Sequence, residues 1–129
     1  MSLDVSLLYT AVLGLLHVPL TGFVALYRIQ HQILLFDGGD KVMGQRMRAQ
    51  ANYAENVPIA LILLLALDAV GAPALWLHAL GATLVVSRIV HYITISTNPA
   101  NTLPRVIGMA GTLGVILAAA SWLLYFYLT

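Results

Sequence analysis

Four long apolar segments alternate with short polar ones along the chain, over about residues 5–30, 45–69, 74–95 and 105–128. Each is close to the roughly 20 residues that a helix needs to cross the hydrocarbon core of a bilayer. Helices are expected because an open strand in lipid would leave backbone N–H and C=O groups without hydrogen-bond partners. The pattern therefore predicts an all-α membrane protein, a single four-transmembrane-helix bundle over residues 1–129.

The three polar connections differ in charge. Residues 35–41 form a glycine-containing loop, and residues 68–73 and 97–101 read as tight turns with glycine or proline. The basic residues gather near the first and third connections: Arg28, Lys41, Arg46, Arg48 and Arg105. Because cytoplasmic loops carry an excess of Lys and Arg, loops one and three are predicted to be cytoplasmic and both termini to lie outside.

Composition supports a membrane protein and narrows the chemistry. Of the 129 residues, 60% are hydrophobic and 9% are charged, against about 25% charged in soluble domains. The net charge of +1 argues against a nucleic-acid partner, which would need a basic stripe. No cysteine is present, so a reactive thiol would have to come from a ligand. The N-terminal segment has no basic region or clear cleavage site, and it is expected to be retained as a span.

A polar cluster opens the second apolar segment. Arg48, Asn52 and Glu55 are four and three residues apart, so they share one helix face at or near membrane depth. Arg88 lies in the third segment, and both it and Glu55 are expected about 20 Å from the turn that joins the two helices. The two charges are therefore expected to meet, with His91 one turn beyond Arg88 on the same face.

Two interpretations of this cluster remain open. A buried pair between Glu55 and Arg88 could serve only to fix helix register. However, arginines outnumber the single glutamate, and arginine binds carboxylates in a bidentate manner, which favours an anionic ligand. Pro58 cannot donate to the carbonyl of Ala54, so it could loosen the helix beside such a site.

Other polar and small residues predict less chemistry. The four histidines, His17, His31, His78 and His91, lack the pairing that a metal site requires, and no metal is expected. Gly108, Gly111 and Gly114 in the fourth segment predict a close approach to a neighbouring helix.

The motif Arg48-Ala49-Gln50-x-Asn52-x-x-Glu55-x-x-Pro58 resembles the signature of the membrane-associated proteins in eicosanoid and glutathione metabolism. The resemblance implies a four-helix bundle assembled as a homotrimer, with glutathione bound between neighbouring subunits near the cytoplasmic side. It implies a glutathione transferase, or a glutathione-dependent peroxidase, acting on lipophilic electrophiles. The short chain is most similar to the bacterial branch of the family, which implies a bacterial inner membrane.

The resemblance also assigns roles to individual residues. It implies that Arg105 is the catalytic residue and stabilises the glutathione thiolate, because a nearby cation lowers a thiol pKa. The residues that it implies in binding glutathione are Arg28, Arg48, Gln50, Asn52 and Glu55. Arg88 and His91, identified above in the third segment, complete the set of candidate glutathione-binding residues.

The chain departs from the eicosanoid-making members at Asn56, His91 and Ile95, where those members carry tyrosines that help to bind glutathione. A non-catalytic glutathione- or lipid-binding membrane protein is therefore an alternative. A small exporter fits less well, because such exporters place their glutamate in the first span with few arginines nearby.

Overall fold

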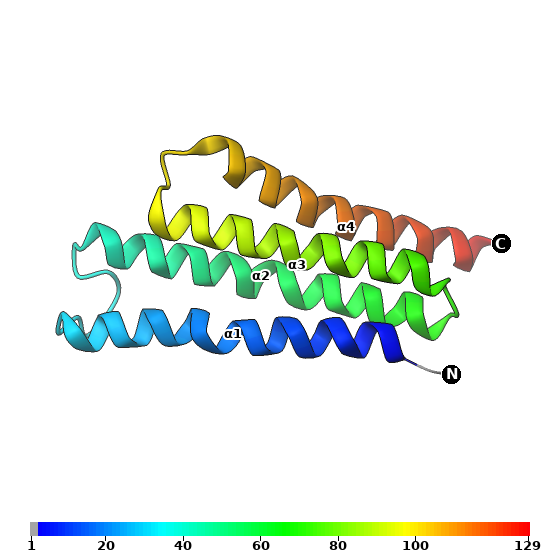
Figure 1. The fold of residues 1–129 in the computed structure, drawn as a ribbon, viewed down its shortest axis with the longest axis horizontal. Helices are drawn as coiled ribbons and strands as arrows, with labels where there is room; N and C mark the ends of the chain where they lie inside the picture. The colour runs from blue at the N-terminus through cyan, green and yellow to red at the C-terminus, as the bar shows by residue number, and fades with distance from the viewer. Residues whose placement is uncertain (1–2) are drawn as a thin grey trace.

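The computed structural model describes residues 3–129 as four helices, α1 (Asp4–Gln30), α2 (Lys41–Ala69), α3 (Ala74–Thr97) and α4 (Thr102–Leu128). All four are long and apolar enough to cross a membrane (Figure 1). The predicted all-α transmembrane fold is confirmed.

Local capping explains where α2 begins and ends. The Asp40 carboxylate accepts a hydrogen bond from the Met43 backbone N–H at 2.9 Å, so α2 begins at Lys41, earlier than the apolar pattern suggested. That hydrogen bond holds the pKa of Asp40 below its usual value of 3.8. After the last turn of α2, Gly71 takes a φ of +82°, which favours glycine, and the chain reverses into α3.

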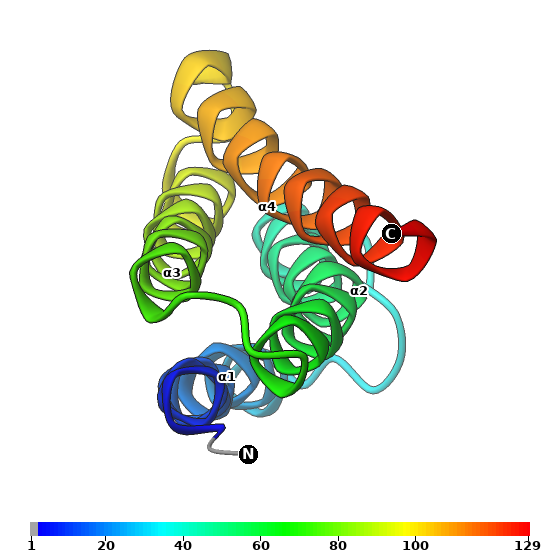
Figure 2. The same ribbon diagram turned by 90° about the vertical axis from the view of Figure 1, so that its right-hand side faces the viewer.

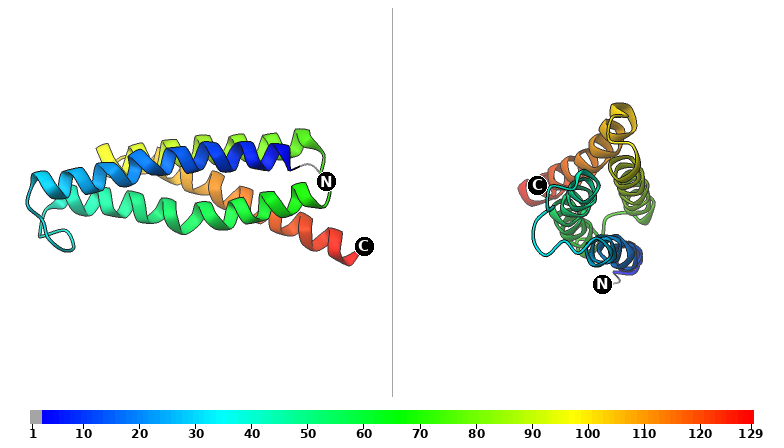
Figure 3. Two further views of the ribbon diagram at one scale, coloured as in Figure 1. Left: turned by 90° about the horizontal axis from the view of Figure 1, so that it is seen from below. Right: turned by 90° about the vertical axis from the view of Figure 1, so that its left-hand side faces the viewer.

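The helices run alternately up and down. The α1–α2 loop and the α3–α4 turn lie at one end of the bundle, called the loop end, and both termini lie at the other (Figure 1). Helices α1 and α4 lie on opposite sides of the α2–α3 pair and do not contact each other (Figure 2). Helix α4 crosses the bundle obliquely (Figure 3).

The interior combines an apolar core with hydrogen bonds between helices. Tyr53 of α2 donates to the carbonyl of Leu13 at 2.6 Å, and Tyr92 of α3 donates to a second carbonyl of α1 at 3.2 Å. Near the termini, the Asp68 carboxylate accepts from the backbone N–H and the hydroxyl of Ser6, at 2.8 and 2.7 Å. These bonds fix α1 against α2 and α3 at three depths. The buried core consists of Leu13, Tyr53, Val57, Ala60, Leu64, Leu67, Leu77, Leu84, Val115 and Ala119.

Glycines set the contact between α3 and α4. A Cβ at Gly108 would lie 2.8 Å from the Ser87 carbonyl oxygen, and one at Gly111 would overlap the Ser87 side chain. The predicted close approach is therefore confirmed for these two glycines. Gly114 faces open space, with nothing within 4 Å of a Cβ placed there.

Candidate functional site

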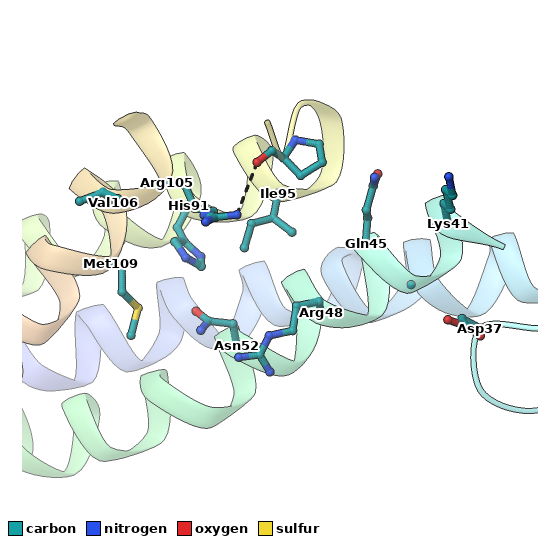
Figure 4. Close-up of a pocket in the computed structure, with 12 residues that line it drawn as sticks. Asp37, Lys41, Gln45, Arg48, Asn52, His91, Ile95, Arg105, Val106 and Met109 are labelled. Carbon is teal, nitrogen blue, oxygen red and sulfur yellow. Dashed lines mark hydrogen bonds between the residues drawn. The ribbon is translucent and has the colours of Figure 1, made fainter. Parts of the chain in front are cut away.

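A cleft of about 810 Å³ opens at the loop end between the start of α2, the end of α3 and the start of α4 (Figure 4). The first turns of α4 form one wall of the cleft, and α4 packs on both α2 and α3 as it crosses the bundle obliquely (Figure 3). The cleft is lined by Asp37, Lys41, Gly44, Gln45, Arg48, Asn52, His91, Ile95, Pro99, Arg105, Val106 and Met109.

Four of the predicted site residues line this cleft. Arg48 and Asn52 of α2 face His91 of α3 and Arg105 of α4 across it (Figure 4). Arg105 is held by a hydrogen bond of 3.4 Å from its Nη1 to the carbonyl of Pro99, in the turn before α4. The sequence thus placed a set of polar side chains correctly at one end of the bundle.

Arg88 lies behind the cleft wall and is 1% exposed. Its Nη1 donates to Asn52 Oδ1 at 2.8 Å, and its Nη2 donates to the carbonyl of Gly108 at 3.1 Å. Its Nε has no hydrogen-bond partner, and within residues 3–129 no carboxylate lies within 4 Å of the guanidinium. Arg88 therefore holds the Asn52 amide in place at the cleft wall. No carboxylate among the described residues neutralises the charge of Arg88.

The predicted contact between Glu55 and Arg88 was wrong. Glu55 instead pairs with Arg48 at 3.4 Å, and both side chains are more than half exposed. Equal depth along two helices does not make two side chains meet, because their directions also depend on the rotation of each helix about its axis. Residues three apart on a helix differ by about 60° in direction, which is enough to turn Asn52, and not Glu55, toward Arg88.

Two further predicted residues face away from the cleft within one chain. Arg28 donates to the carbonyl of Ile33 at 3.4 Å and contacts Met47 Sδ at 3.5 Å. Gln50 donates to Thr21 Oγ1 of α1 at 3.5 Å. Arg28 and Gln50 thus lie on the α1–α2 side of the bundle.

The sequence did contain a signal for cleft residues that were not predicted. Lys41, Gln45, Arg48 and Asn52 follow one another at spacings of four, three and four, so they form a single polar stripe on α2. Lys41 was overlooked because the second helix was expected to begin at about residue 45, and Gln45, at that expected start, was not identified as a site residue. Asp37, in the loop before α2, carried no periodic signal.

The charge balance of the cleft is positive. Its lining holds three cations, Lys41, Arg48 and Arg105, and one carboxylate, Asp37. Apolar side chains of Ile95, Val106 and Met109 form the rest of the α3–α4 wall. Such a cleft can bind an anion while keeping an apolar group beside it. Among residues 3–129, no group of three His, Asp or Glu side chains could hold a metal ion.

Comparisons with known proteins agree with this architecture. The model of the MAPEG family matches residues 6–125. The chain is also 32% identical over 88 residues to inner membrane protein YecN of Escherichia coli, in strain K12 and in strain O6:H1. These alignments cover 68% of this chain and 67% of the relative. No solved structure matches the chain. The family match spans all four helices, and this four-helix membrane protein belongs to the MAPEG family.

Proposed function

We propose that the protein is a membrane-bound glutathione transferase, or a glutathione-dependent peroxidase, that acts on lipophilic electrophiles. The observation that carries this proposal is the cationic cleft, in which three cations and one carboxylate lie beside an apolar wall. Glutathione has two carboxylates, one ammonium group and a thiol, so its net negative charge complements the cleft. The volume of about 810 Å³ lies within the range of small-molecule sites.

The polar residues suit separate parts of glutathione. Arg48 provides a forked donor for one carboxylate, and the Asn52 amide can donate to the ligand while its oxygen accepts from Arg88. Glu55 is the partner for the ammonium group; it does not itself line the cleft, but it pairs at 3.4 Å with Arg48, which does. Binding would then replace the exposed Arg48–Glu55 pair by two pairs with the ligand.

Arg105 is the catalytic residue of the proposal. A guanidinium remains protonated at any working pH, so Arg105 acts by electrostatic stabilisation and not as a base. Glutathione supplies the nucleophilic sulfur, and a cation beside it raises the thiolate fraction at neutral pH. Val106 and Met109 follow Arg105 on α4 and provide the apolar surface that an electrophile from the bilayer would need.

Assembly as a homotrimer is part of the proposal, with its site between neighbouring subunits. Arg28 and Gln50 lie outside the cleft of their own chain. They can join a glutathione site only if a neighbouring copy presents its α1–α2 side to the cleft. We also propose the bacterial inner membrane as the location, as for YecN, with the loop end in the cytoplasm.

One observation supports the alternative of a non-catalytic glutathione- or lipid-binding protein. His91 and Ile95 line the cleft at positions where the eicosanoid-making members carry tyrosines, so the cleft has fewer hydroxyl groups to hold the ligand. A binding protein would keep the cations of the cleft but would not need a stabilised thiolate.

Thiolate absorbance on mixing the purified protein with glutathione separates the two functions. The wild type should form thiolate at neutral pH and turn over a model electrophile or a peroxide. Arg105→Gln should lose thiolate formation and turnover while glutathione affinity, measured by calorimetry, changes less. Arg105→Lys is the matched variant and should recover part of the rate, because it restores the charge. Binding without thiolate or turnover in the wild type would establish the non-catalytic alternative.

A further inference from the structure

A second recess lies between α1 and α3, on the side of the bundle away from α4. It has a volume of about 370 Å³ and is almost wholly apolar. Its rim includes Phe23, Ile89 and Ile93, all more than a third exposed, and its floor includes Tyr53, which is 3% exposed. Every lining residue belongs to a membrane-spanning helix, so the recess opens to hydrocarbon. The lining consists of Leu16, Pro19, Leu20, Phe23, Tyr53, Arg88, Ile89, Tyr92 and Ile93.

A third recess, of about 300 Å³, continues from the second toward the loop end. The two share Phe23, Tyr92 and Ile93, so together they form one continuous groove, here called the α1–α3 groove. The added lining is polar and consists of Arg46, Ser96 and Thr97. The groove therefore changes from apolar at mid-membrane to polar and cationic at the loop end.

The groove is lined by two arginines, of which Arg88 is 1% exposed and Arg46, at the loop end, has donors to spare. Arg46 Nη1 makes one weak hydrogen bond, of 3.4 Å, to the carbonyl of Phe23. The guanidinium carbon lies 4.4 Å from the centre of the Tyr27 ring, and this stacking holds the side chain in place. In the part of the chain that the structure describes, no carboxylate lies within 4 Å of Arg46. Arg46 is thus a fixed cation with unused N–H groups at the end of an apolar groove.

We propose that the α1–α3 groove binds one anionic phospholipid of the surrounding bilayer. The phosphate meets Arg46 at the loop end, and an acyl chain lies along the apolar part between Leu16 and Ile89. The length agrees with this assignment. From Ile89 to Thr97 the groove extends about 12 Å along α3, close to the roughly 15 Å of hydrocarbon in one leaflet.

The polarity of the groove favours a lipid over other occupants. A free phosphate would leave the apolar recess empty, and an uncharged lipid would leave Arg46 without a partner. Basic pockets between spanning helices on the cytoplasmic side are typical binding sites for anionic headgroups. This proposal does not depend on glutathione, since the groove and the cleft have no lining residue in common.

Native mass spectrometry of the delipidated wild-type protein tests the proposal directly. The probes are phosphatidylglycerol and phosphatidylcholine with identical acyl chains. We expect one phosphatidylglycerol to remain bound, with about a fivefold preference over phosphatidylcholine, the effect of one cation near an anionic group. Arg46→Gln should abolish the preference, and Ile93→Trp, which fills the groove, should reduce retention of both lipids.

Matched controls separate the groove from the rest of the surface. Arg28→Gln removes a loop-end cation that bonds elsewhere, and Ile62→Trp adds the same bulk at an exposed position of α2; neither should change lipid retention. A wild type without the preference, an Arg46→Gln variant that keeps it, or an Ile93→Trp variant that binds like wild type would each overturn the proposal.

If a variant does not fold, cross-linking of the wild type to a photoactivatable phosphatidylglycerol tests the proposal instead. Labels on α1 and α3 along the groove support the proposal, and labels confined to other faces, or a second copy covering the groove, refute it.

Discussion

The hydrogen bond between Asn52 and Arg88 gives the sharpest test of the structure. It is short, at 2.8 Å, and it joins two side chains that are 7% and 1% exposed. Within residues 3–129, Asn52 supplies the only side-chain oxygen that accepts a hydrogen bond from Arg88; the other acceptors are the Gly108 carbonyl and the Met109 sulfur. Removing the Asn52 oxygen therefore leaves a buried cation with one good acceptor.

The expected coupling energy of this hydrogen bond follows from two known ranges. Side-chain hydrogen bonds between neutral groups inside membrane proteins contribute about 0.6 kcal/mol on average in double-mutant cycles. Bonds to an ionised group are roughly twice as strong. We therefore expect a coupling energy of about 1–2 kcal/mol between Asn52 and Arg88. Because Asn52 lines the cleft, water can replace part of the lost bond, which favours the lower half of this range.

The assay is a double-mutant cycle with Asn52→Ala, Arg88→Met and the double variant. The free energy of unfolding is measured by circular dichroism during titration with a denaturing detergent. Asn52→Asp is the matched variant, and it should be at least as stable as the wild type, because it gives Arg88 a carboxylate partner at the same position. Coupling below about 0.3 kcal/mol, the usual error of additivity, would refute the arrangement. So would an Asn52→Asp variant that is as unstable as Asn52→Ala.

Three further predictions concern packing, pH and binding. Gly108→Ala should destabilise the protein by about 1 kcal/mol in the same unfolding assay, because its Cβ meets α3 backbone at 2.8 Å, whereas Gly114→Ala faces open space and should not. The pKa of Asp40 is lowered in the folded state, so its carboxylate contributes to stability above pH 3.8 and loses that contribution as the pH falls through the folded-state pKa. Asp40→Asn should therefore flatten the decline of melting temperature between about pH 5 and 3. Arg48→Ala and Glu55→Gln should each weaken glutathione binding more than tenfold, about 1.4 kcal/mol, by calorimetry, and unchanged affinity in folded variants would make that ion pair structural.

The sequence predicted the features that depend on composition over many residues. Four apolar stretches of spanning length can satisfy their backbone groups in lipid only as helices, so the fold followed from length and hydropathy. The spacing of Arg48 and Asn52 likewise placed both on one face, which the structure turns into the cleft. These inferences needed no knowledge of how helices are rotated against one another.

The features that were missed depend on rotation and on single contacts. Glu55 lies one turn from Asn52, and only the packing of α2 against α3 and α4 decides which of them Arg88 meets. Gln50 turns toward Thr21 because α1 packs on that side of α2. The α1–α3 groove left no periodic signal, because its residues come from three helices and its loop-end cation, Arg46, resembled the other basic residues of the loop end.

Arg88 also fixes the position of α4. Its Nη2 bonds to the Gly108 carbonyl, which also accepts from the Thr112 hydroxyl at 3.0 Å, so α4 is held against α3 at the close approach of Gly108 to the α3 backbone. Arg105 lies less than one turn before Gly108 on the same helix. The position of Arg105 in the cleft therefore depends on the contact that Arg88 and Gly108 make behind it. A buried arginine with no acid partner among residues 3–129 is costly in a membrane, and within this bundle it fixes the helix that carries the proposed catalytic cation.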